Sequence, residues 1–102
     1  MAAEVADRYG HRIYLTDERW EHIVFEHPEM IGHDRELFVT LRRGRRRQEA
    51  RDPGRYRYVM SFSDLRPGNS IVVVVKFTFS KDGSPNNFVL TAYQQFIHSR
   101  QR

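Results

Sequence analysis

Residues Ser70–Ser80 read SIVVVVKFTFS, and a run this rich in β-branched and aromatic side chains is typical of a strand at the centre of a sheet. Lys76 places a positive charge inside the run. Because successive side chains of a strand point to opposite faces of its sheet, Lys76 lies opposite to Val75 and Phe77. The run therefore predicts a sheet that buries one face in the core and keeps a lysine on the other.

The two segments on either side of this strand repeat its alternation. Arg55–Phe62 and Asn87–Phe96 each carry mostly apolar side chains on one face and more polar ones on the other. The intervening turns, DLRPGN and KDGSPN, have the length and composition of hairpin turns, and a weaker strand, RRRQEA, precedes the turn RDPG. We expect the helices to cover the sheet face that is lined by Tyr58, Val73, Val75 and Leu90.

The N-terminal part of the chain predicts a short strand followed by a helix. The strand is Arg12–Leu15. Thr16 is a suitable N-cap, and acidic residues follow it in the first turn of a helix that we expect at Asp17–His27. Pro28 ends this helix, because the residue before a proline avoids the α region.

A second helix is predicted shortly afterwards. Asp34 is its expected cap, an apolar stripe runs through RELFVTLRRG, and Gly44 marks its end. The remaining segments all have the character of strands. The predicted fold class is therefore α+β, with one or two N-terminal helices packed on a four-stranded antiparallel sheet.

Length and composition limit the classes of protein that this chain can represent. Its 102 residues suffice for one core, so we expect a single domain over residues 1–102 with its fold between about residues 12 and 96. The absence of cysteine excludes disulfides, thiolate metal sites and a cysteine nucleophile. No signal peptide is recognisable, and no apolar run approaches the ~20 residues of a membrane span. We expect a cytoplasmic protein that does not enter membranes.

Positive charge is the strongest compositional signal. Lysine and arginine number 17 against 13 acidic residues, which gives a net charge of +4. Most of the basic residues are arginines, whose guanidinium groups bind phosphate bidentately. We predict that the turn RRGRRR binds nucleic-acid phosphates without reading sequence. A solvated basic turn is the alternative interpretation of Arg42, Arg43, Arg45, Arg46 and Arg47.

The sheet face that carries Lys76 is a candidate site. Arg57, Thr91 and Tyr93 are predicted to lie on the same face. A lysine between valines is partly desolvated, and it is well placed to meet an anion or to stabilise developing negative charge. The alternative is the ordinary solvated face of an antiparallel sheet.

Two histidines in the first predicted helix are candidates for acid or base chemistry. His22 and His27 are five residues apart and lie on different helix faces, which argues against a shared zinc site. Imidazole titrates near neutral pH, so either could act as a general acid or base. Each also has a structural interpretation, because His27 can interact with the helix dipole and His22 can lie on a solvated helix face.

The segment RIYLTDERWEHIVFEHPEM and the strands YRYVMSF, VVVVKF and FVLTAYQQ resemble the phage-associated barnase/EndoU/colicin/RelE-like (BECR-fold) nucleases, and HI…HPEM is the most specific part. The resemblance covers about residues 13–95 of the chain. These proteins are small RNase toxins and related domains with one or two N-terminal helices and a four-stranded antiparallel sheet. The resemblance implies RNA cleavage without metal or cofactor, by attack of the ribose 2′-hydroxyl on the adjacent phosphate.

Carried over by position, the resemblance implies catalytic roles for His22, His27, Lys76, Thr91 and Tyr93, and a phosphate-binding role for Arg57. The expected function is a metal-independent endoribonuclease, as the toxin of a toxin–antitoxin or phage-related system. The expected partners are RNA and a cognate antitoxin or immunity protein. The alternative is a non-catalytic nucleic-acid-binding or protein-binding module on the same fold, because a fold does not determine a function.

Overall fold

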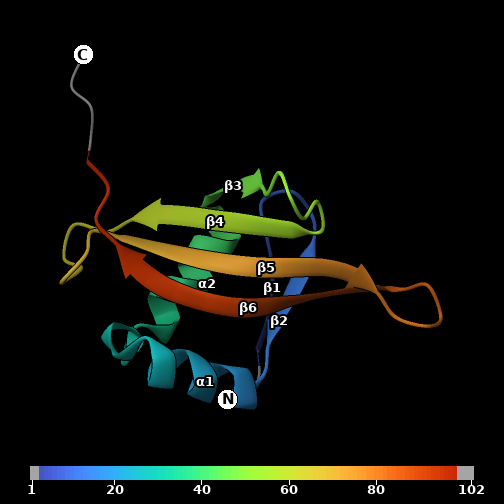
Figure 1. The fold of residues 1–102 in the computed structure, drawn as a ribbon, viewed down its shortest axis with the longest axis horizontal. Coiled ribbons are helices and arrows are strands. Elements are labelled where there is room, and N and C mark those ends of the chain that lie inside the picture. Colours follow the sequence, from blue (N-terminus) through green and yellow to red (C-terminus); the bar gives the residue numbers. More distant parts are fainter. Residues whose placement is uncertain (1–2, 99–102) are drawn as a thin grey trace.

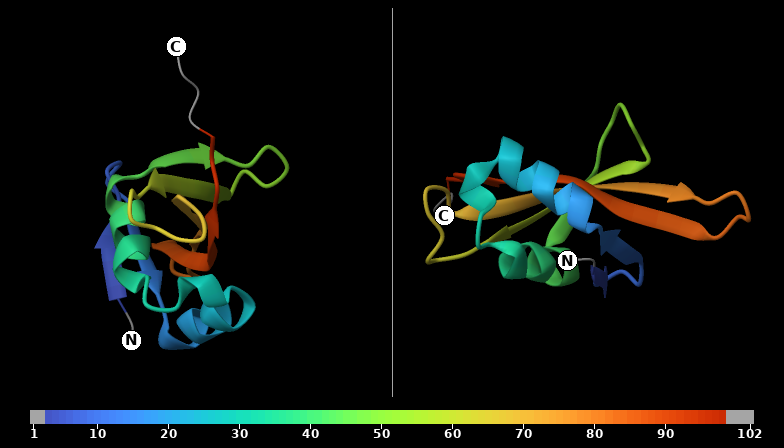
Figure 2. Two further views of the ribbon diagram at one scale, coloured as in Figure 1. Left: turned by 90° about the vertical axis from the view of Figure 1, so that its left-hand side faces the viewer. Right: turned by 90° about the horizontal axis from the view of Figure 1, so that it is seen from below.

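In the computed structural model, residues 3–98 form a curled sheet with two α-helices (Figures 1 and 2). The structure describes residues 3–98. The elements, in chain order, are β1 Ala3–Ala6, β2 Arg12–Leu15, α1 Asp17–Glu26, the short 3-10 helix η1 Pro28–Met30, α2 Asp34–Arg43, β3 Arg45–Gln48, β4 Arg55–Ser61, β5 Ser70–Phe79 and β6 Pro85–Gln95.

The sheet differs from the one that the sequence predicted. It has six strands in the order β1-β2-β6-β5-β4-β3, and the pair β2 and β6 is parallel. The expected four-stranded antiparallel sheet is therefore wrong. After the hairpin from β5 to β6, one edge of β6 still needs a partner for its backbone groups, and β2 supplies it around Tyr14 and Phe88. β1, which was not predicted, then pairs with β2.

The local signals for the helices are largely confirmed. The Thr16 side-chain oxygen accepts a hydrogen bond from the Arg19 amide at 3.1 Å, so Thr16 caps α1 as predicted. The helix ends just before Pro28, with His27 as its C-cap. The prediction of Asp34 as a cap is wrong, because His33 takes that position. Asp34 lies in the first turn of α2, where its negative charge interacts favourably with the helix dipole.

The helices pack on the expected face of the sheet, with one correction. Tyr58, Val73 and Val75 are buried in the core cluster, to which both helices contribute. Leu90 does not line this face. The β5–β6 register shifts between Val74 and Val75, and Val89 occupies the core position instead. Such a bulge interrupts the alternation of side chains without leaving a mark in the hydrophobic pattern.

The opposite face, which we call the outer face, carries no helix in residues 3–98 (Figures 1 and 2). Val72 and Val74 point to this face, yet they are buried. Side chains of the adjacent strands flank them in register, with Val59 and Tyr93 beside Val72 and Arg57 and Thr91 beside Val74. β5 is therefore buried on both faces over its first half, as expected of a central strand.

Asp7, in the turn between β1 and β2, connects the two ends of the sheet. Its carboxylate accepts hydrogen bonds from the Tyr58 hydroxyl on β4 and from Arg46 Nη1 on β3, the latter at 3.4 Å. It also accepts the backbone amides of Tyr9 and His11 at 2.9 and 2.8 Å. β1 and β3 are at opposite ends of the strand order, so these contacts show that the sheet curls until its edges approach each other.

The charge of Asp7 is stabilised by its surroundings. Burial alone would raise the pKa of Asp7, but hydrogen bonds from Tyr58, His11 and Tyr9 and the charge of His11 outweigh burial and lower it below its ordinary value of 3.8. Burial and the adjacent carboxylate raise the pKa of Tyr58, which remains a donor. Because the pKa of Asp7 is lower in the folded than in the unfolded chain, its ionisation stabilises the fold above pH 3.8. This stabilisation is lost as the pH falls through the folded value.

We expect Asp7→Asn to lower the free energy of unfolding at pH 7 by about 1–3 kcal/mol, because Tyr58 and Arg46 lose a buried anionic acceptor. Urea denaturation at pH 7 and pH 3 measures the effect, and the loss should shrink at pH 3, because below the ordinary pKa of 3.8 the unfolded chain binds a proton at Asp7 more readily than the folded chain does. Asp64→Asn, at an exposed position, is the matched control and should change stability little. Equal losses at both pH values would contradict a role for the Asp7 charge.

Candidate nucleic-acid interface

A group of arginines surrounds the end of α2 and the edge strand β3. α2 ends at Arg43, and the chain enters β3 at Arg45 after the single residue Gly44. A glycine is needed here, since a Cβ at this position would lie 2.5 Å from the Thr40 carbonyl oxygen and 2.9 Å from that of Val59. This close passage brings the arginines of the helix end beside those of the strand.

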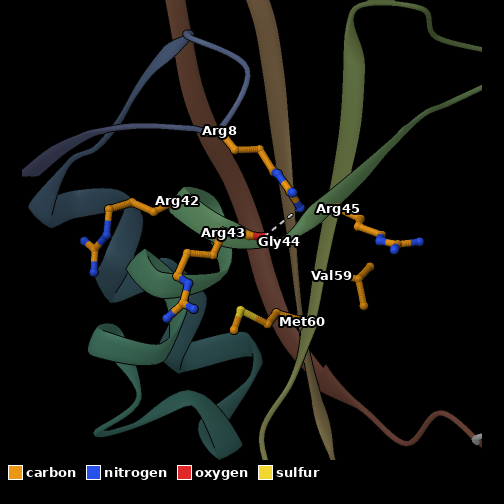
Figure 3. Close-up of a pocket in the computed structure, with 7 residues that line it drawn as sticks. All are labelled: Arg8, Arg42, Arg43, Gly44, Arg45, Val59 and Met60. Carbon is orange, nitrogen blue, oxygen red and sulfur yellow. Dashed lines mark hydrogen bonds between the residues drawn. The ribbon is translucent and has the colours of Figure 1, made fainter.

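These arginines line a depression of about 510 Å³ (Figure 3). Its lining residues are Arg8, Arg42, Arg43, Gly44, Arg45, Val59 and Met60. Arg8 comes from the turn between β1 and β2 and donates a hydrogen bond to the Arg43 carbonyl oxygen at 3.3 Å. Figure 3 shows Arg42 and Arg45 pointing to opposite sides, so the positive charge is spread along the surface rather than focused on one point.

We call Arg8, Arg42, Arg43, Arg45 and Arg47 the arginine surface. Within residues 3–98, none of these side chains forms an ion pair with a carboxylate. Their charge is therefore available to an external anion. Arg46 differs from its neighbours, because it points to the core side of β3 and pairs with Asp7. Arg8 was not among the predicted residues, since nothing in the local sequence places it beside α2.

The two cations predicted for the outer face are already paired. Asp52 accepts hydrogen bonds from the Lys76 ammonium group at 3.0 and 3.2 Å, and Glu49 accepts from Arg57 at 2.7 and 3.2 Å. Both acids lie in segment 49–54, between β3 and β4. The hydrogen bond from Lys76 lowers the pKa of Asp52. The sequence signal that could have predicted this pairing is the presence of two acidic residues, Glu49 and Asp52, in a stretch that is otherwise basic.

His27 reaches the outer face around the edge of β6. Its ring centroid lies 5.6 Å from that of Tyr93. Thr91, two residues before Tyr93, has a buried hydroxyl oxygen without a hydrogen-bond partner among residues 3–98. Glu29 of η1 lies beside them, with a carboxylate oxygen 3.7 Å from His27 Nδ1, and it accepts the backbone amide of Gln94. We call His27, Thr91 and Tyr93 the edge group.

His22 is not part of this group. It is exposed on the side of α1 that faces solvent, beside Glu18, Glu21 and Phe25. The five candidate catalytic residues are therefore divided among three places. His27, Thr91 and Tyr93 form the edge group, Lys76 is held by Asp52, and His22 lies on a different surface.

Residues 3–98 contain neither a cluster of metal ligands nor a membrane-spanning helix. No three histidine or acidic side chains in this range lie close enough together to hold a metal ion. Neither α1 nor α2 has the length and hydrophobicity that a helix needs to cross a membrane.

Segment 49–54 should mask positive charge, and this can be tested by removing its acids. We expect the double replacement Glu49→Gln and Asp52→Asn to release Arg57 and Lys76, so that the protein elutes from immobilised heparin at a higher salt concentration. The control is Glu18→Gln with Glu21→Gln on α1, which makes the same change in net charge at another surface. If both double variants elute at the same salt concentration, the effect is one of net charge alone and masking is rejected.

Comparison with known proteins adds no relative from which a function could be transferred. Models of protein families, curated proteins and solved structures were compared with the chain, and none of them matches it. The resemblance to the BECR-fold nucleases therefore rests on the sequence motifs alone. The functions that can be proposed follow from the arginine surface and the edge group.

Proposed function

We propose that this protein binds RNA by holding its phosphate backbone on the arginine surface. The observation that carries the proposal is the set of five arginines without a carboxylate partner in residues 3–98. Guanidinium groups bind phosphate oxygens bidentately, and contacts of this kind supply most of the sequence-independent affinity for nucleic acids.

The spread of the arginines favours an extended polyanion over a small one. They come from the turn after β1, from the end of α2 and from β3, and Figure 3 shows two of them pointing apart. A single phosphate group could contact few of them at once. A nucleic-acid backbone offers one charge per nucleotide along a continuous path, which matches this arrangement. We propose RNA rather than DNA because the motif HI…HPEM is the most specific part of the resemblance to the BECR-fold nucleases, which include small RNases.

Replacing Arg42, Arg43 and Arg45 together with Gln should weaken RNA binding by about ten-fold or more near physiological salt. The slope of log affinity against log salt should also become shallower by about 2, because each lost contact to a single strand contributes about 0.7. Fluorescence anisotropy with labelled RNA across a salt series measures both quantities.

The matched control for this triple variant replaces Arg12, Arg35 and Arg66, which are exposed and lie outside the arginine surface. It makes the same change in net charge and should alter the slope much less. An unchanged slope in the Arg42, Arg43 and Arg45 variant would reject the phosphate-binding role. Equal changes in the two variants would reject the assignment to this surface.

Cleavage of RNA is a second candidate, and the edge group favours it. Attack of a ribose 2′-hydroxyl on the adjacent phosphate needs a base for the 2′ proton, an acid for the 5′ oxygen and donors for the phosphate oxygens. An imidazole can serve as such a base or acid, which makes His27 the candidate for proton transfer, and the Tyr93 hydroxyl can donate to an oxyanion. The contact between the His27 and Tyr93 rings, whose centroids lie 5.6 Å apart, supports this candidate because it places a proton-transfer group beside a hydroxyl donor.

In this second candidate, His27→Gln should reduce cleavage by about 10²-fold or more and remove one ionisation from the pH–rate profile. His22→Gln is the control, since it changes a histidine of the same helix outside the edge group. Labelled RNA in EDTA should yield 2′,3′-cyclic phosphate ends. Full cleavage by His27→Gln would exclude the edge group. RNA binding without cleavage by the wild type would leave the binding function alone.

A further inference from the structure

The inner face of the sheet continues beyond the helices as a row of aromatic rings. Tyr56 on β4 and Phe77 on β5 have ring centroids 4.9 Å apart, and His11 contacts Phe77 edge-on at 5.1 Å. Phe79 follows Phe77 on the same face of β5, and Tyr9 lies in the turn that precedes β2. We call this set the aromatic platform: Tyr9, His11, Tyr56, Phe77 and Phe79.

Arg46 lies among these rings. Its guanidinium carbon is 4.2 Å from the ring centroid of Tyr9, 4.6 Å from that of Tyr56 and 5.5 Å from that of Phe77. Asp7 holds the same guanidinium by an ion pair of 3.4 Å. The cation and the rings are therefore fixed relative to one another before any ligand arrives.

The aromatic platform borders the arginine surface at two places. Arg46 stands between Arg45 and Arg47 on the edge strand β3, and these two neighbours belong to the arginine surface. Arg8 directly precedes Tyr9 in the chain. A nucleic-acid strand that is bound along the arginines can thus reach the rings over the edge of β3 or along the turn after β1.

Two rings of the platform are exposed to a degree that packing does not require. Phe79 is 71% exposed and Tyr9 is 45% exposed. At Tyr9, which directly follows Arg8, exposed aromatic surface lies next to uncompensated positive charge, and this combination points to a ligand that is both anionic and aromatic. Phe25 is even more exposed, at 84%, but its neighbours include Glu18 and Glu21, so this combination is absent there.

We propose that the aromatic platform stacks the unpaired bases of single-stranded RNA whose phosphates lie on the arginine surface. This inference rests on the proposed RNA binding. Every base has a π-face, so exposed aromatic rings accept bases with little regard to sequence. Paired bases in a duplex are not available for stacking on a protein. The adjacent positive charge disfavours a second copy of this basic chain as the occupant.

The experiment compares the wild type with Phe79→Ala and Tyr9→Ala, using three labelled probes of equal length. The probes are single-stranded RNA, a duplex of the same sequence and an abasic ribose-phosphate strand. Each variant should bind single-stranded RNA about ten-fold more weakly, as is typical for the loss of one stacking ring. Binding to the duplex and to the abasic strand should stay within about two-fold of the wild type, because phosphate contacts are unchanged.

Phe25→Ala is the matched control and should bind all three probes like the wild type. If Tyr9→Ala disturbs Arg46, the result for Phe79→Ala is decisive, because Phe79 is exposed. Circular dichroism can verify that the Phe79→Ala variant keeps its fold. The platform is rejected if both variants retain wild-type affinity for single-stranded RNA while the Arg42, Arg43 and Arg45 variant loses it. If that arginine variant also binds normally, the proposed RNA binding itself has failed. Conversion of a dimer to a monomer by Phe79→Ala, with unchanged RNA affinity, would show a self-contact and also reject the platform.

Discussion

The carboxylate of Asp7 is the constraint on which the shape of this fold depends. It accepts hydrogen bonds from backbone amides of the turn that it begins and from side chains of β3 and β4, so a residue near the start of the chain holds strands from its middle. α2, which contacts β1, β4 and β5, is enclosed by the curl that results. Closure through buried side chains lets a six-stranded sheet surround a core without completing a hydrogen-bonded barrel.

The sequence predicted those elements whose signals are local. Thr16 and Pro28 delimit α1, and the run that contains Lys76 is the central strand. The parallel pairing of β2 with β6 could not be predicted, because strand order depends on which edges remain unpaired after the hairpins form. β1 is four residues long and lacks a pattern that distinguishes it from a loop. The bulge at Leu90 was hidden because Leu90 and Val89 are equally apolar.

The candidate site was also predicted only in part, because only its local features leave a signal in the sequence. The basic turn is visible in the sequence. Arg42, Arg43 and Arg45 line one depression and Arg47 is exposed on the same strand as Arg45, whereas Arg46 is turned inward by its place in β3. The pairing of Lys76 with Asp52 spans 24 residues and requires the hairpin geometry, so a lysine that looked free in the sequence is held by a carboxylate. Long-range ion pairs of this kind decide whether a charge is available, and alternation along a strand contains no information about them.

β3 is the last strand of the sheet, and in residues 3–98 no other strand pairs with its outer side. An open edge of this kind can serve as a template on which another protein copy adds a strand. Three consecutive arginines occupy β3, so an antiparallel copy would bring guanidinium groups opposite one another across the new ladder. By this charge repulsion, the arginines of β3 that are proposed to attract RNA should also disfavour growth of the sheet at its open edge. A chain that lost these arginines would lose its safeguard against self-assembly together with its affinity for polyanions.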